Sequence, residues 1–357
     1  MTMLSMRLPA FTSDYSAAAS IVSDMGGMAV LYGPTQCLEN CISFDDRDLI
    51  QNPEQAFSSP IGVPEILHGD ETGIIRRIMR ACNDISPKFI AVLGTAVSAF
   101  MGCDLNRISS IVESCSRVPC IAIDVNGFET YRQGIFKTVS AFIDRFGGKE
   151  RKGTGRTANI LGYTWFDYPN PDDKSALIES MKDIGFDSIN FFPGADIEDY
   201  ASIGSADLNL AVSASGVDIA DSLRDRYRID PLSIPQIEAD INIPDGSKVL
   251  IVGDCVASSL IAASLEKNGC VCSTASFFGS IGHKKHKTFV MNDERDLEDL
   301  IDDGGFDYLI GDPLLKNLKC KVPELILMPH PAISGRLFID DSIKQIGAIM
   351  NIQEYIT

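Results

Sequence analysis

Residues 248–268 read KVLIVGDCVASSLIAASLEKN, and this stretch indicates how the rest of the chain folds. Its first five residues are almost continuously apolar after the lysine, as in a strand buried on both faces of a parallel sheet. A Gly-Asp turn follows, and the residues after it have the apolar pattern of a helix that packs on such a sheet. A strand, a short turn and a helix in this order form one half of a βαβ unit.

The same pattern recurs along the 357 residues. Short apolar runs occupy residues 28–32, 89–93, 120–125, 160–164, 188–192, 208–212, 308–310 and 324–328. Amphipathic helical patterns lie between several of them, as at residues 74–85 and 217–227. Strands that alternate with helices predict mostly parallel sheets, so we assign the chain to the α/β class. Two polar stretches, 147–155 and 236–247, predict boundaries between three α/β domains at 1–147, 156–236 and 246–357.

Composition excludes several classes of protein. The formal charge is −18, from 31 Lys and Arg against 49 Asp and Glu, and it argues against nucleic-acid binding. The basic cluster at residues 283–287 is interpreted as a solvated loop. No apolar run of membrane-spanning length and no signal-peptide pattern occur, so we expect a cytoplasmic protein without a membrane anchor. Its 10 cysteines are then expected to be reduced, and to serve in metal binding, catalysis or packing.

Three cysteines lie near strand ends, where ligands bind in parallel sheets. Cys37 follows the run 28–32 through a Gly33-Pro34 turn, and Cys41 comes four residues later. Cys103 directly precedes a helical pattern. A thiol near backbone N–H groups can ionise and act as metal ligand or nucleophile. The alternative interpretation is that Cys37 and Cys41 are small buried side chains and that Cys103 is a partly buried loop cysteine.

Small residues follow several other strands, and we expect them to line a cofactor or substrate site. They are Gly94, Thr95, Ser98, Ser213, Ser215, Gly216, Gly253, Asp254 and Cys255. Neither a complete dinucleotide fingerprint nor a P-loop is present, which argues against classical NAD binding and ATP hydrolysis by this chain. His330, between two prolines after the last strand, titrates near neutral pH and is the candidate catalytic proton donor. The alternative is a loop histidine with satisfied hydrogen bonds.

Read in order, several segments resemble the nitrogenase component 1 family, which includes nitrogenase catalytic subunits, cofactor-assembly scaffolds and tetrapyrrole reductases. The first half contributes MAVLYGPTQC (28–37), EILHGDETGIIRRI (65–78), PKFIAVLGTAVSAFMGCDLNRI (87–108) and VPCIAIDVNGFETYRQG (118–134). The second half adds NILGY (159–163), residues 248–269 and MPHPAISGRLF (328–338). The resemblance covers nearly the whole chain in order, although each motif alone is weak.

This resemblance implies three Rossmann-like domains with mostly parallel sheets around a central cleft. It also implies a homo- or heterodimer, formed with itself or with a paralogous component 1 subunit, that receives electrons from an ATP-dependent iron–sulfur reductase. Cys37 matches the family's cluster cysteine, so an iron–sulfur cluster, expected to be [4Fe-4S], would be shared between subunits, with Cys41 or Cys103 as a second ligand from each. The family's active-site cofactor cysteine falls at Ser213, so a nitrogenase-type molybdenum cofactor is not expected.

Three functions stay open at this stage. The chain can be a redox enzyme subunit that reduces a substrate in the cleft, a non-catalytic scaffold for a metallocluster or tetrapyrrole, or a metal-free small-molecule binding protein. For the first, the acidic run Asp45-Asp46-Arg47-Asp48 is a candidate contact for the reductase. Its alternative interpretation is a solvated loop.

Overall fold

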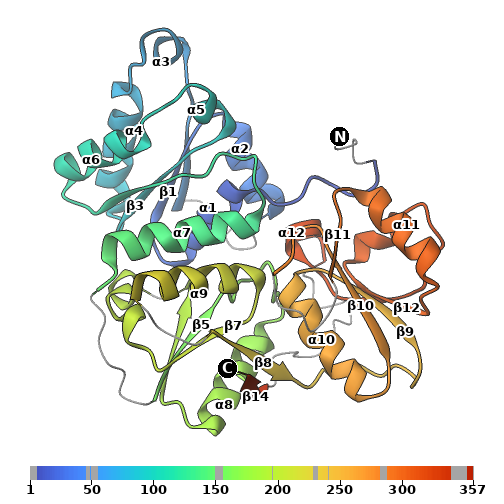
Figure 1. The fold of residues 1–357 in the computed structure, drawn as a ribbon. Helices are drawn as coiled ribbons and strands as arrows, with labels where there is room; N and C mark the ends of the chain where they lie inside the picture. The colour runs from blue at the N-terminus through green and yellow to red at the C-terminus, as the bar shows by residue number, and fades with distance from the viewer. Residues whose placement is uncertain are drawn as a thin grey trace. The chain divides into compact units, whose positions relative to one another are not determined.

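The computed structural model describes residues 6–45, 49, 55–148, 156–194, 196–227, 232–239, 241–281, 288–338 and 352–356 (Figure 1). Strands and helices alternate along these ranges and form three sheets. The predicted α/β class with mostly parallel sheets is confirmed. The basic cluster at 283–287 lies outside the described residues.

The first sheet has the strand order β2-β1-β3-β4, with all neighbours parallel. Its strands are β1 (Met28–Tyr32), β2 (Ala56–Ser59), β3 (Ile90–Leu93) and β4 (Cys120–Ile123). On one side α1 (Asp14–Asp24) packs on β1, α7 (Tyr131–Phe146) packs on β4, and the two helices pack together. The opposite side is covered by α4 (Thr72–Ile85) and α6 (Leu105–Ser116), whose apolar faces meet alternate strand residues in one core.

Short elements complete this part of the chain at the strand ends. They are α2 (Thr35–Asn40), the π-helical segment η1 (Cys41–Asp45), α3 (Val63–His68) and α5 (Ala96–Phe100). Because β1, β3 and β4 are parallel, the loops at their carboxyl ends lie along one edge of the sheet. The loops that carry Cys37 and Cys103 are both at this edge.

The second sheet has the order β14-β8-β7-β5-β6. Its strands are β5 (Thr157–Leu161), β6 (Ser188–Phe192), β7 (Leu208–Ala211), β8 (Leu232–Ile237) and β14 (Ile352–Ile356). Strand β14 pairs antiparallel with β8, whereas the other neighbours in the described residues are parallel. The helices α8 (Pro171–Ile184) and α9 (Ala214–Tyr227) follow β5 and β7, and the 3-10 helix η3 (Ile197–Ser205) follows β6.

The third sheet has the order β11-β10-β9-β12-β13 and is parallel throughout. Its strands are β9 (Lys248–Val252), β10 (Val271–Ser276), β11 (Thr288–Val290), β12 (Tyr308–Gly311) and β13 (Glu324–Leu327). The connecting helices are α10 (Cys255–Lys267), α11 (Glu294–Gly304), η4 (Pro313–Asn317) and α12 (Pro331–Ser334). Helix α10 is buried along most of its length because residues of β7, β8 and β9 all share its core.

The chain divides into two compact units. The N-terminal unit comprises Thr12–Gly148 and Pro193–Ile203 and contains the first sheet. The C-terminal unit comprises Met1–Phe11, Lys149–Phe192 and Gly204–Thr357 and contains the other two. Whether the three predicted segments are separate domains stays a prediction. Within the described residues, no helix is long and apolar enough to cross a membrane.

Candidate functional site

The thiol of Cys37 lies at the carboxyl edge of the first sheet. After β1 the chain turns at Gly33, where an added Cβ would lie 2.1 Å from Thr95 Oγ1, so only glycine allows the β1 and β3 loops to approach this closely. Pro34 then precedes α2, and Cys37 sits in the first turn with its N–H bonded to Pro34 O at 3.1 Å. The Cys37 side chain is half-buried, so it is reachable from outside. This is the location predicted from the Gly-Pro turn.

The second thiol of this loop faces inward. Cys41 is fully buried at the start of η1, and its Sγ lies 3.2 Å from Ser16 Oγ on α1. Ser16 also donates to Asp45 Oδ2 at 2.6 Å, and Thr12 donates to Asp45 Oδ1 at 3.1 Å. Asp45 is therefore enclosed by α1, and its predicted role as an exposed contact for a reductase is wrong. The rest of that acidic run, residues 46–48, lies outside the described residues.

Tyr15 lies beside both thiols. Burial raises the pKa of its phenol, and the neighbouring Cys37 and Cys41 raise it further. The phenol therefore stays protonated at neutral pH and presents an O–H group to the thiols. The sequence did not predict Tyr15 as a site residue, because a tyrosine near the start of a helix is not specific to any one function.

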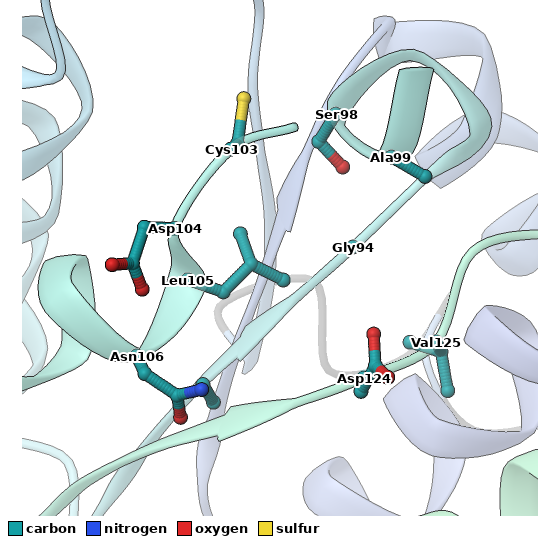
Figure 2. Close-up of a pocket in the computed structure, with 10 residues that line it drawn as sticks. Gly94, Ser98, Ala99, Cys103, Asp104, Leu105, Asn106, Asp124 and Val125 are labelled. Carbon is teal, nitrogen blue, oxygen red and sulfur yellow. The ribbon is translucent and has the colours of Figure 1, made fainter. Parts of the chain in front are cut away.

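Next to this loop, a cavity of about 220 Å³ opens at the carboxyl ends of β3 and β4 (Figure 2). It is lined by Gly94, Ser98, Ala99, Cys103, Asp104, Leu105, Asn106, Ala122, Asp124 and Val125. Figure 2 shows the oxygens of Ser98 and Asp124 near the space beside Gly94, and the sulfur of Cys103 pointing away from Asp124. Burial raises the pKa of the Cys103 thiol, and the Glu71 carboxylate adds to the effect.

Two of the three predicted lining residues of this loop reach the cavity. Gly94 and Ser98 line it, although Ser98 Oγ is already engaged with the backbone N–H and C=O of Thr95 at 2.7 and 2.9 Å. Thr95 itself is buried and donates to Tyr32 O at 2.8 Å. Thr95 thus joins the β1 and β3 loops, and the cavity is built by the residues around it.

The fit to an iron–sulfur cluster is partial. A [4Fe-4S] cluster needs four thiolates. Among the described residues of the chain, no group of three or more His, Cys, Asp or Glu side chains is placed to hold a metal ion. Cys41 is sealed against Ser16, whereas Cys37 and Cys103 are half-buried. The described residues of one chain therefore do not supply a complete set of cluster ligands, and Cys37 and Cys103 are the thiols of these loops that stay reachable.

In the C-terminal unit, Asp254 occupies the loop between β9 and α10. Its carboxylate accepts from Val256 N at 2.9 Å and Ala257 N at 3.0 Å, which caps α10. It also accepts from Ala214 N at 3.0 Å, at the first residue of α9. The N-termini of two helices, which would attract a phosphate or another anion, are thus occupied by the protein's own carboxylate.

The other predicted residues of these loops are also buried. Ser213 Oγ donates to Gly162 O at 2.7 Å and lies 2.9 Å from Ser215 Oγ. Gly216 lies so close to β5 that an added Cβ would be 2.1 Å from Leu161 O. Cys255 is 1% exposed. That these residues line a ligand site stays a prediction, since their contacts here are within the protein.

His330 follows β13 and is 3% exposed. Its backbone N–H donates to Asp312 Oδ2 at 2.9 Å. In the side chain, Nε2 lies 3.6 Å from Asp167 Oδ1, and the ring stacks on Phe278 with centroids 5.3 Å apart. Burial lowers the pKa of His330 to about 4. The imidazole is therefore neutral at pH 7, and its role as a proton donor stays a prediction.

Sequence reasoning missed Asp312 and Asp167, which hold His330. Asp312 was detectable, because Gly311-Asp312 after β12 repeats the Gly253-Asp254 pattern after β9, and both carboxylates accept from the helix that follows. Asp167 gives no such signal, since it lies in an aromatic loop after β5. Only the fold brings it to the imidazole.

These observations define an α/β protein with three mostly parallel sheets and a half-buried thiol at the edge where such sheets bind ligands. A scan against protein-family models matches residues 13–237 to "Nitrogenase component 1 type Oxidoreductase". This match covers more than half of the chain, and the chain belongs to that family. The matched range contains Cys37, Cys41, Cys103 and Ser213 and ends before His330.

Solved structures show the same fold. "Nitrogenase Cp1 at pH 6.5" aligns with a TM-score of 0.70 at 14% identity, over 98% of this chain and 92% of that one. "Nitrogenase Cp1 at pH 5" aligns with a TM-score of 0.66 at 13% identity, over 87% and 81%. At such identities the likeness concerns the fold alone. A search of curated proteins gave no match.

Proposed function

We propose that this chain is a component 1-type oxidoreductase subunit, which reduces a substrate with electrons from an ATP-dependent iron–sulfur reductase. Cys37 is its ligand to an iron–sulfur cluster shared with a second subunit. One observation carries this proposal: within the region that defines the family, Cys37 is a reachable thiol at the ligand-binding edge of the first sheet. All ten cysteines are thiols, which suits a cytoplasmic protein.

The sharing of the cluster follows from the count of ligands. Cys41 is enclosed, so each protomer offers Cys37 and, from the next loop, Cys103. Two protomers then supply the four thiolates of a [4Fe-4S] cluster, and a paralogous component 1 subunit can replace one of them. The chain is thus a dimer, with itself or with such a paralogue. The cluster supplies the electron chemistry, while the protein residues position it.

Anaerobic reconstitution with iron and sulfide tests this proposal, with iron counted per chain and the visible spectrum recorded. Cys37→Ala should lose most of the iron, and Cys103→Ala part of it. Cys115→Ala is the matched control, because Cys115 is an exposed thiol on α6 away from the loop. Full iron content in Cys37→Ala would overturn the assignment. Light scattering of the same samples should show a dimer only when iron is bound or a paralogue is present.

A second function, metal-free binding of a small molecule, is favoured by the cavity in Figure 2. It combines a hydroxyl, carboxylates and an amide with apolar walls in about 220 Å³. Wild-type protein that shows no iron–sulfur spectrum after anaerobic purification would support this function and exclude the first. Turnover that depends on the reductase distinguishes the redox enzyme from a non-catalytic scaffold for metallocluster or tetrapyrrole assembly. The enzyme would show such turnover, and the scaffold would not.

A further inference from the structure

Two phenylalanine side chains lie exposed and in contact at the carboxyl edge of the first sheet. Phe100, the last residue of α5, is 82% exposed, and Phe128, in the loop between β4 and α7, is 64% exposed. Their rings meet edge to face, with centroids 5.5 Å apart. Large apolar side chains that touch each other on the surface indicate a contact site for another molecule.

Phe128 adjoins the first of the two reachable thiols. Gly127, which precedes it, lies against the ring of Tyr15, where an added Cβ would be 2.8 Å from Cε1. Tyr15 in turn lies beside Cys37. The loop is fixed at this point, because Gly127 N donates to Asp14 Oδ1 at the start of α1 at 2.6 Å. The ring of Phe128 is therefore presented by a held backbone next to the Cys37 loop.

Phe100 adjoins the second thiol. Cys103 follows it three residues later, and Cys103 N donates to Ser98 O at 3.1 Å, which closes the turn between them. Met101 N donates to Val97 O at 3.1 Å, so the backbone on both sides of Phe100 is tied down. A contact surface that is already ordered loses less conformational entropy when a partner binds.

A second copy of this chain is the partner that fits this surface. Under the function proposed above, on which this inference rests, another chain must bring thiolates to Cys37 and Cys103 and so must cover the surface around them. Stable subunit interfaces have apolar, aromatic-rich centres, whereas transient electron-transfer contacts are small. In a two-fold dimer both protomers use the same patch, so an apolar patch meets an apolar patch.

We propose that Phe100 and Phe128 form the apolar anchor on which a second copy of this chain docks, at the edge that carries Cys37 and Cys103. The rings of the two protomers bury one another and hold the chains together beside these thiols. The anchor acts through the affinity between the chains and supplies no ligand itself. Its loss and the loss of a ligand therefore have different signatures.

Sedimentation velocity over a dilution series of the anaerobically reconstituted protein tests the anchor, with iron counted in the same samples. Phe100→Ser/Phe128→Ser should raise the dissociation constant of the dimer about 100-fold, because both protomers lose two aromatic anchors. Its iron should be lost at low protein concentration and return at high concentration, where the dimer forms again. Cys37→Ala should lack most of the iron at every concentration.

Two further variants serve as controls. Phe100→Leu/Phe128→Leu keeps apolar side chains at both positions and should retain most of the affinity. Leu337→Ser removes a side chain that is 56% exposed but belongs to the C-terminal unit, so its dissociation constant should equal that of the wild type. Circular dichroism of the serine variant should match the wild type, because both phenylalanines are exposed.

An unchanged dissociation constant in the serine variant would overturn the anchor and leave the iron assignment to Cys37 intact. This holds also if that variant accepts electrons from the reductase more slowly, since the pair would then belong to the reductase contact. A wild type that associates only with a paralogous subunit would overturn the choice of a second copy. A wild type that holds no iron would overturn the proposed function, and this inference with it.

Discussion

The buried imidazole of His330 gives a pH dependence whose sign can be worked out. Burial lowers its folded-state pKa to about 4, below the ordinary value of 6.5. The unfolded chain then binds a proton more readily than the folded chain between these values. Stability from this residue is fully present above pH 6.5 and is lost as the pH falls toward 4. The perturbation is a shift from pH 7 to pH 5, in the wild type and in His330→Gln.

The magnitude follows from the two pKa values. With 6.5 in the unfolded state and about 4 in the folded state, acidification from pH 7 to pH 5 destabilises the wild type by about 2 kcal/mol through this residue. His330→Gln lacks this contribution, since glutamine does not titrate. Other buried acids, such as Asp312, contribute to both proteins and cancel in the difference.

One neighbour opposes this expectation. Asp167 Oδ1 lies 3.6 Å from His330 Nε2, and an ionised carboxylate at that distance favours the charged imidazole. We expect burial to outweigh it, because His330 is 3% exposed and an ion pair there would have to be desolvated. If the pair is ionic instead, the folded-state pKa rises above 6.5 and the wild type gains stability, relative to His330→Gln, as the pH falls.

Urea denaturation of both proteins at pH 7, 6 and 5 measures the difference directly. His68→Gln is the control, because His68 is exposed at the end of α3 and should follow the wild type. Parallel curves for the wild type and His330→Gln, or a wild type that becomes relatively more stable at pH 5, would refute the dominance of burial.

Three further outcomes are expected. Asp254→Ala removes the cap of α10, which should lower the free energy of unfolding by about 1–2 kcal/mol. It also leaves the buried Ala214 N–H without an acceptor, which should cost about 1–3 kcal/mol more. Asp254→Asn should cost less than Asp254→Ala in denaturant unfolding. Glu294→Ala frees the backbone N–H groups of residues 6–8, so trypsin should cleave after Arg7 faster than in the wild type. Burial raises the pKa of Cys120 to about 12, so mass spectrometry should find exposed Cys115 alkylated at pH 8 while Cys120 is spared until unfolding.

The strands that sequence reasoning found are those whose pattern is decided by burial on both faces. Runs such as residues 28–32 and 248–252 became β1 and β9 with the expected bounds, because interior parallel strands need apolar side chains at every position. Five strands, β2, β8, β10, β11 and β14, were not predicted. The sequences of β2, β10 and β11, AFSS, VCSTAS and TFV, are short or rich in small polar residues, and β2 and β11 lie at sheet edges, where one side needs less cover.

The sequence spacing of Cys37 and Cys41 did not predict how the two thiols are exposed. Cys37 and Cys41 are four residues apart, which places them on one face of a regular α-helix. The chain changes to a π-helical turn at Cys41, and Ser16 of α1 covers the thiol. The contact that covers Cys41 is tertiary, because α1 comes from an earlier part of the sequence. No local sequence pattern predicts the change from α-helix to π-helix at Cys41. The location of Cys37 was predictable, whereas the enclosure of Cys41 was not.

Glycines after strands are ambiguous for a related reason. A missing Cβ allows close approach, but the sequence does not say what approaches. At Gly94 and Gly216 it is a backbone carbonyl of the protein, Val125 O and Leu161 O, so these glycines hold neighbouring loops together. At Gly253 an added Cβ would meet only side-chain atoms, the nearest being His330 Cδ2 at 3.3 Å. Identical sequence signals thus mark a close backbone approach in one place and looser side-chain packing in another, and only the surrounding atoms distinguish the two.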